Sequence, residues 1–168
     1  MQETPQQYTQ RVLGYVAEEE PLKLLAATPK KLDRLMGRAS ASKLRKRPAP
    51  DKWSVGEILA HLADVEIAVG WRVRAILGAP GTPVQAFDQD AWVVAGHYDK
   101  RLPRESVAQL RAVRAANLAL YKSLSREQWK QYGIHSERGQ ESVEHIVRLL
   151  AGHDLNHLRQ IEDILSTK

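Results

Sequence analysis

Cysteine is absent from the 168 residues of this sequence. Its absence excludes disulfide bonds, thiolate metal ligands and a cysteine nucleophile. If the chain binds a metal ion, the side chains that hold it must therefore come from histidine, aspartate or glutamate.

Long apolar runs are absent as well. No stretch approaches the roughly 18 consecutive apolar residues that a membrane-spanning helix needs. The opening residues MQETPQQYTQ have neither the basic nor the apolar region of a secretory leader. Hydrophobic residues make up 43% of the chain and charged residues 27%, which is typical of a domain that buries its own core. We therefore expect one soluble domain over residues 1–168, located in the cytoplasm.

Strand patterns are scarce, because alternating β-branched runs are missing while apolar residues recur at helical spacing. Capping boxes at residues 54–57 and 125–128 mark two helix starts. A threonine before Pro5 marks another, and a threonine before Pro29 indicates a restart inside the next helix. Residues 39–52 and 131–140 are predicted to be loops. The predicted helices cover residues 4–19, 21–37, 55–77, 104–124, a short segment after residue 125, and 141–165.

Four of these helices are long, which predicts an all-α fold, a four-helix bundle. The links between the long helices are short except for about 26 residues, 78–103, between the second and third bundle helices. Only a turn at FDQDAWVV interrupts that connection. A connection of this length can span the bundle, so we expect the second and third helices to run parallel.

The last helix carries two histidines where apolar residues should continue. Its inward stripe includes Ile146 and Ile161, and His153 and His157 occupy positions between them. Residues four apart on a helix are separated by about 40° around the axis and about 6 Å along it, so both imidazoles point the same way. His61 borders the apolar face of the second bundle helix. Three histidines from two facing helices are therefore predicted to converge inside the bundle.

Two interpretations of these histidines compete. A single histidine near a core, such as His61 taken alone, is usually a packed residue whose nitrogens bond to backbone or carboxylate groups. Two unpaired imidazoles buried together are costly, and a shared metal ion would offset that cost. From spacing alone, both interpretations remain open.

The motifs WSVGEILAHLADVE and AGHDLNHLRQI together resemble the DinB-like superfamily, which includes the YfiT-type proteins. The resemblance extends over about residues 8–165. It implies a four-helix bundle with a long link between helices two and three. It also implies a recurring signature of one histidine on the second helix and a His-x-x-x-His pair on the fourth.

By position, the resemblance assigns His61, His153 and His157 as ligands of a divalent metal ion, with nickel or zinc as the expected cofactor. Gln160 follows the pair where many relatives also have glutamine. His135 is followed by serine where relatives often have proline, so no site role is carried over to His135.

Three imidazoles leave coordination positions for water or substrate, as in catalytic rather than closed structural sites. Such an ion can activate water for hydrolysis or hold a thiolate for thiol transfer. Relatives include both metal-dependent hydrolases and S-transferases that use low-molecular-weight thiols, and the sequence does not choose between them. A carboxylate often supports a ligand histidine, and the candidates are Glu57, Asp64 and Asp154, with Asp64 favoured. For each of the three, a plain surface carboxylate is the expected alternative.

Two other functions compete with a metal-dependent enzyme acting on a small molecule. One is a non-catalytic bundle in which the metal has a structural or sensing role. The other, ranked last, is nucleic-acid binding, suggested by the net charge of +5, the pI of about 9.6 and the run KLRKR at residues 43–47. By analogy with similar bundles we also expect a homodimer, with Trp71 or Trp92 facing the partner.

Overall fold

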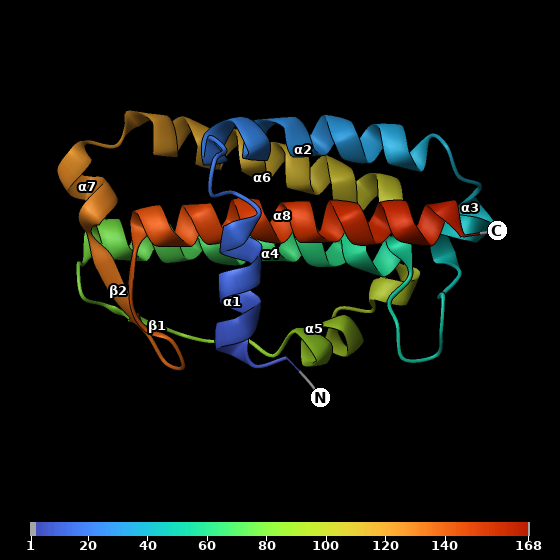
Figure 1. Ribbon diagram of the computed structural model, residues 1–168, viewed down its shortest axis with the longest axis horizontal. Helices are drawn as coiled ribbons and strands as arrows, with labels where there is room; N and C mark the ends of the chain where they lie inside the picture. The colour runs from blue at the N-terminus through green and yellow to red at the C-terminus, as the bar shows by residue number, and fades with distance from the viewer. Residues whose placement is uncertain (1–2, 168) are drawn as a thin grey trace.

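Four long helices form the frame of the protein in the computed structural model, which describes residues 3–167 (Figure 1). Contacts between the second and third of these helices show their relative direction. Asp64 bonds to Gln109, and Gly70, further along the second helix, lies against Asn117, further along the third. These two helices therefore run parallel, as the long connection predicts, and the four-helix bundle is confirmed. The four helices are α2 (Pro21–Met36), α4 (Val55–Gly78), α6 (Pro103–Ser123) and α8 (Val143–Ser166).

The predicted capping boxes fix where helices begin. At α4, Ser54 Oγ accepts the N–H of Glu57 at 3.2 Å, and Glu57 Oε2 accepts the N–H of Ser54 at 2.7 Å. Two backbone donors at the helix start are thereby satisfied. Equivalent boxes begin α1 (Pro5–Gly14) and α7 (Arg126–Lys130).

Helix α2 does not restart at Pro29, which corrects the expectation from the sequence; the helix runs unbroken through the proline. A proline has no N–H for the carbonyl of residue i−4, here Leu25. The Nη1 of Arg114, on α6, donates to that carbonyl at 2.7 Å. A side chain from a neighbouring helix thus supplies the missing hydrogen bond.

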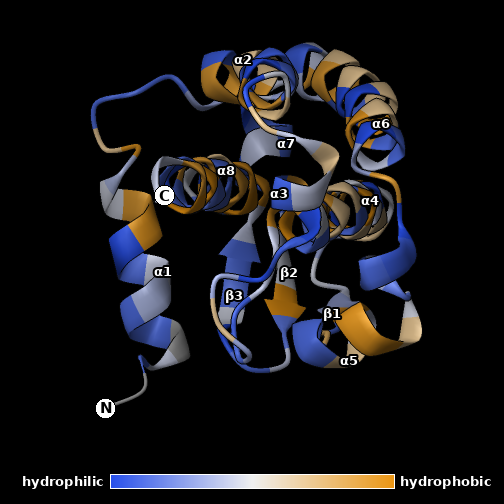
Figure 2. Ribbon diagram, turned by 90° about the vertical axis from the view of Figure 1, so that its right-hand side faces the viewer, coloured by the Kyte–Doolittle hydropathy of each residue, from blue (hydrophilic) through white to orange (hydrophobic). Residues whose placement is uncertain are grey.

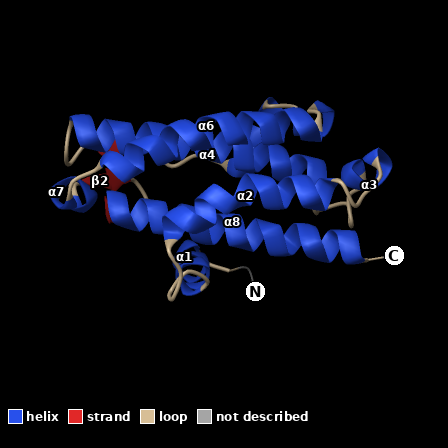
Figure 3. Cartoon of the chain, turned by 90° about the horizontal axis from the view of Figure 1, so that it is seen from above, coloured by secondary structure: helices blue, strands red, loops and turns tan. Residues whose placement is uncertain are grey.

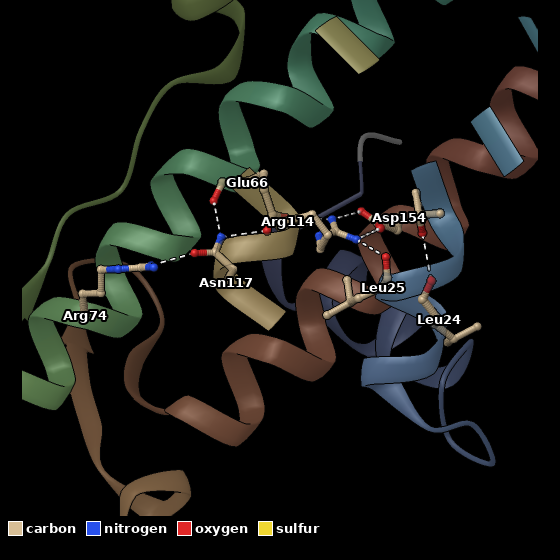
Figure 4. Close-up of polar contacts among 8 residues, drawn as sticks. Leu24, Leu25, Glu66, Arg74, Arg114, Asn117 and Asp154 are labelled. Carbon is tan, nitrogen blue, oxygen red and sulfur yellow. Dashed lines mark hydrogen bonds and ion pairs between the residues drawn. The ribbon is translucent and has the colours of Figure 1, made fainter. Parts of the chain in front are cut away.

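Arg114 is the centre of a buried charge cluster that joins all four long helices (Figure 4). Its Nη1 lies 2.8 Å from Asp154 Oδ2 on α8, and its Nη2 lies 2.8 Å from Glu66 Oε2 on α4. Asn117 donates to Glu66 Oε1 at 2.7 Å. One guanidinium therefore lies between two buried carboxylates and a backbone carbonyl.

A small sheet replaces the loop predicted for residues 131–140. Strand β2 (Tyr132–His135) pairs parallel with β1 (Pro83–Val84) and antiparallel with β3 (Gly139–Ser142). Gly139, with a φ of 76°, occupies the left-handed region at the hairpin turn. Strands of two to four residues are too short to show an alternating pattern, which explains why the sequence did not reveal them.

Short helices interrupt the other predicted loops. The long connection contains α5 (Gln89–Ala95), where a turn was expected, and a 3₁₀ turn, η1 (Tyr98–Lys100). The loop predicted over residues 39–52 contains α3 (Ala41–Arg45).

The sheet, α1 and α5 lie beside the α4–α8 pair, whereas α3 and α7 lie at opposite ends of the bundle (Figure 1). Viewed along the bundle, α2 and α6 lie above α8 and α4, and the sheet and α5 lie below them (Figure 2). Helix α1 crosses the outer side of α8 (Figure 3), and Val12 of α1 and Val16 of the turn that follows it are completely buried. The α4–α8 pair is therefore enclosed by α1, the sheet and α5.

Helix α1 packs on the backbone of α8 at Gly152. A Cβ on Gly152 would lie 2.1 Å from the carbonyl oxygen of Val12. Replacing glycine with alanine inside a helix otherwise stabilises it by roughly 1 kcal/mol. We expect Gly152→Ala to destabilise the protein instead, by about 1–3 kcal/mol, because α1 must shift.

Urea unfolding measures this effect, and limited proteolysis within α1 shows whether the helix has loosened. Gly14→Ala is the matched control, because a Cβ at that helical position would meet nothing within 4 Å. A Gly152→Ala protein as stable as the wild type would contradict the close packing of α1 on α8.

None of the helices within residues 3–167 combines the length and apolar character that crossing a membrane requires.

Candidate metal centre

Three imidazoles meet between α4 and α8. His61 comes from α4, and His153 and His157 come from successive turns of α8. Each offers a ring nitrogen, and the three nitrogens lie within 4.8 Å of one another. The structure thus brings together the three histidines that the sequence singled out.

The spacing of the imidazole nitrogens fits a shared ion. Nε2 of His61 lies 3.0 Å from Nε2 of His153. Two nitrogens that each lie about 2.0–2.1 Å from one zinc ion are separated by roughly 2.9–3.4 Å at coordination angles near 90–110°. The His61–His153 pair therefore fits a divalent ion of the zinc type, and a ring nitrogen of His157 lies within 4.8 Å of both.

Burial sets the protonation of the site. It lowers the pKa of His157 to about 4, and it lowers the pKa values of His61 and His153 well below the usual range. The neighbouring histidines lower the pKa of His153 and His61 further. All three imidazoles are therefore neutral at pH 7, which is the form that binds metal ions.

Gln160 supports one of the histidines. Its Oε1 lies 2.9 Å from Nδ1 of His157, and an amide oxygen can only accept a hydrogen bond. Nδ1 of His157 therefore carries the proton, which leaves the lone pair of Nε2 free for an ion.

Two of the three carboxylates proposed as support for the site, Asp64 and Glu57, bond elsewhere. Asp64 accepts hydrogen bonds from Tyr98, Arg101 and Gln109. Glu57 caps α4 and forms an ion pair with Arg47. Among the described residues, neither carboxylate has a hydrogen bond to a histidine of the cluster.

Two of the carboxylates expected at the surface are buried. Glu57 and Asp154 are each only 1% exposed. Glu57 lies under Arg47, and Asp154 faces Arg114 of α6. For Asp154 the expectation was wrong because a position about 100° from one helix interface faces another helix in a bundle. For Glu57 it was wrong because the carboxylate caps α4 and is covered by Arg47.

The tryptophans have different surroundings. The Trp53 ring centroid lies 4.9 Å from that of His61, so Trp53 packs directly on the cluster. Trp92 stacks on Phe87 with ring centroids 4.3 Å apart, whereas Trp71 is 71% exposed.

A cavity of about 400 Å³ opens beside the histidines. His61 and His153 form part of its wall, together with apolar side chains of α4 and α8. Tyr8 of α1 also lines the cavity, and burial raises its pKa to about 12, so its hydroxyl stays protonated. The sequence did not identify the remaining polar residues of the wall, which include Arg72, His135 and Arg138.

The fold and the site define a class of protein. It is a four-helix bundle with parallel α4 and α6 and with a histidine centre formed by α4 and α8. The sequence profile of the DinB superfamily matches residues 24–161. The chain belongs to the DinB superfamily, which confirms the resemblance seen in the sequence.

Known proteins agree with this assignment. The chain is 28% identical over 148 residues to an Oceanobacillus iheyensis protein named "putative metal-dependent hydrolase", covering 88% of this chain and 84% of the relative. YfiT from Bacillus subtilis, described as "a probable metal-dependent hydrolase with an unusual four-helix bundle topology", superposes with a TM-score of 0.79 and 21% identity. That match covers 96% of this chain and 87% of YfiT.

A mycothiol-dependent maleylpyruvate isomerase shares the fold more distantly, with a TM-score of 0.59 and 11% identity. The match covers 84% of this chain but only 56% of the isomerase.

Proposed function

We propose that this protein is a metal-dependent hydrolase of small molecules, with His61, His153 and His157 as the ligands of one divalent ion, nickel or zinc. The observation that carries the proposal is the 3.0 Å separation of two neutral imidazole nitrogens beside an open cavity. The relative named for metal-dependent hydrolysis supports the reaction class.

A divalent ion bound by three neutral imidazoles keeps positions for water and lowers the pKa of that water toward about 7. The chain's own residues prepare the site for it. Gln160 fixes the tautomer of His157, and the buried position of the histidines keeps them unprotonated. The apolar walls of the cavity limit the access of bulk water to a bound substrate.

Metal analysis tests the ligand assignment. We expect about one equivalent of zinc or nickel per chain in protein purified without a nickel column and then incubated with either ion. Alanine variants of His61, His153 and His157 should each retain less than a tenth of that amount. His145→Gln is the control, because His145 lies near Glu141 and outside the cluster.

Hydrolysis is tested with a panel of esters and amides. Wild-type turnover should disappear with a chelator and return with the metal. Wild-type protein that binds less than a tenth of an equivalent would overturn the proposal, provided that circular dichroism shows it folded.

Thiol transfer is the second candidate, and the thiol-dependent isomerase with the same fold favours it. A bound divalent ion can keep a thiol deprotonated. Turnover that requires a low-molecular-weight thiol would select this reaction over hydrolysis. Metal-dependent stability without turnover of any substrate would instead favour a structural or sensing role.

A further inference from the structure

We propose that the cavity beside the histidines contains an anion subsite, formed by Arg72 and His135, that binds the carboxylate of a small substrate. This inference rests on the proposed function, because it names the kind of molecule that the site would act on. It assigns a role to two residues that the sequence left without one.

Arg72 is a half-buried guanidinium in the cavity wall without a carboxylate partner. Among residues 3–167, no aspartate or glutamate oxygen lies within ion-pair distance of it. Its Nη2 donates to the carbonyl of Gln85, and its guanidinium carbon lies 4.9 Å from the centre of the Phe87 ring. These contacts orient the side chain and leave its charge unneutralised.

His135 adds a hydrogen-bond donor to the same wall. Its Nδ1 accepts the N–H of Glu137 at 3.2 Å, so a neutral ring must carry its proton on Nε2. The side chain is only 2% exposed, and Nε2 has no hydrogen-bond partner among the described residues. An unsatisfied buried donor costs about 1–3 kcal/mol, so this N–H favours binding of an acceptor.

The small sheet holds these two groups near each other. His135 pairs with Val84 in the parallel β1–β2 ladder, and the next residue of that segment, Gln85, accepts the bond from Arg72. Arg72 and Arg138 both line the cavity. Burial lowers the pKa of Arg72, Arg138 lowers it further, and Glu141 acts in the opposite direction. Arg72 is therefore the guanidinium of this wall that has no carboxylate bound to it among the described residues.

The carboxylates around the cavity do not form an ion pair with Arg72 among the described residues. Glu141 is buried but is held by Arg138 at 2.6 and 3.0 Å. Asp88 caps α5 from an exposed position, and Glu137 is also exposed. One guanidinium and one neutral N–H donor remain, and they match the single charge and planar shape of a carboxylate.

The rest of the cavity suits an apolar group. Val65, Val69, Ile146 and Leu150 line it between the wall that carries Arg72 and the histidines of the cluster. A substrate with its carboxylate at Arg72 would lie along this apolar surface with its other end toward His61 and His153. We therefore infer that Arg72 and His135 determine specificity for small acyl compounds that carry a carboxylate.

Binding of benzoate and of benzamide, its neutral analogue, to the metal-free protein tests this inference by calorimetry at low ionic strength. We expect benzoate to bind at least about 10-fold more tightly than benzamide, and Arg72→Gln to remove the difference. Arg74→Gln is the matched control, because Arg74 is on the same helix but bonds to Gly70 and Asn117 outside the cavity. The ¹⁵N resonance of Nε2 in His135 should shift with benzoate and stay unchanged with benzamide.

Three results would overturn the inference: equal binding of the two probes to wild type, an equal loss of benzoate affinity in both arginine variants, or benzoate binding that requires zinc and is unchanged by Arg72→Gln. The third result would mean that the carboxylate binds the ion alone. The measurement on metal-free protein also separates the two proposals. Benzoate binding that depends on Arg72 in a protein that takes up no metal would refute the metal centre and support the anion subsite.

Discussion

Replacing Arg114 with methionine is expected to lower the free energy of unfolding by about 3–5 kcal/mol, because two buried carboxylates lose their counter-charge. Glu66 and Asp154 are both almost fully buried, and the guanidinium contacts each of them at 2.8 Å. The carbonyl of Leu25 would also lose the donor that replaces the N–H missing at Pro29. Methionine fills much of the same volume, so the loss reports mainly on charge and hydrogen bonding.

The Glu66→Gln variant separates the contribution of the buried charges from that of the hydrogen bonds. Burial raises the pKa of Glu66 despite the attraction of Arg114, since one guanidinium faces two carboxylates. The glutamine variant removes one negative charge and retains the oxygen that accepts from Asn117. Its amide NH2 group would face Nη2 of Arg114, and two donors cannot bond to each other, so we expect a loss of about 1–3 kcal/mol, smaller than that of Arg114→Met. Urea unfolding at pH 7 measures both variants, and an Arg114→Met protein within 1 kcal/mol of wild type would contradict the role of the cluster.

The metal-free protein is expected to lose stability as the pH falls from about 6.5 to 4. Burial lowers the pKa of His157 from its ordinary value of 6.5 to about 4, so the unfolded chain takes up a proton in this range before the folded protein does. The stabilisation is complete above pH 6.5 and is lost on acidification, by about 3 kcal/mol for this one group. His61 and His153, whose pKa values are also lowered, act in the same direction.

Urea unfolding in the presence of a chelator, between pH 7.5 and 4.5, measures this dependence. His157→Leu should flatten the curve, because leucine removes the group that titrates in the unfolded chain. A wild-type curve that is level between pH 6.5 and 4.5, or one with the same slope in the variant, would show that His157 is not held neutral by burial.

Periodicity in the sequence was sufficient to predict the bundle and its histidine cluster. Each bundle helix is long enough to show its apolar stripe, and His153 and His157 are visible as polar residues within such a stripe. The parallel α4 and α6 followed from the length of the connection. The sheet could not be predicted, because its strands contain at most four residues.

The charge cluster and the cavity wall depend on contacts between distant residues. Arg114 bonds to Leu25, 89 positions away, and Arg72 reaches Gln85 only after the connection has folded back. One signal was nevertheless present, since Arg114 interrupts the apolar stripe of Leu110, Leu118 and Tyr121 much as the histidines interrupt theirs. A charged residue in an inward stripe indicates a buried partner, and a proline inside a neighbouring helix indicates a carbonyl that needs a donor.

The position of Arg114 also affects how firmly His61 and His153 are held relative to each other. Asp154, which it holds, directly follows His153, and Glu66 lies five residues after His61 on α4. Sliding of α8 along α4 would therefore disturb the ion pairs of Arg114 as well as the spacing of His61 and His153. The buried crosslink through Arg114 thus limits how far the imidazoles of His61 and His153 can move apart. Under the proposed function, its loss would make the metal centre less rigid.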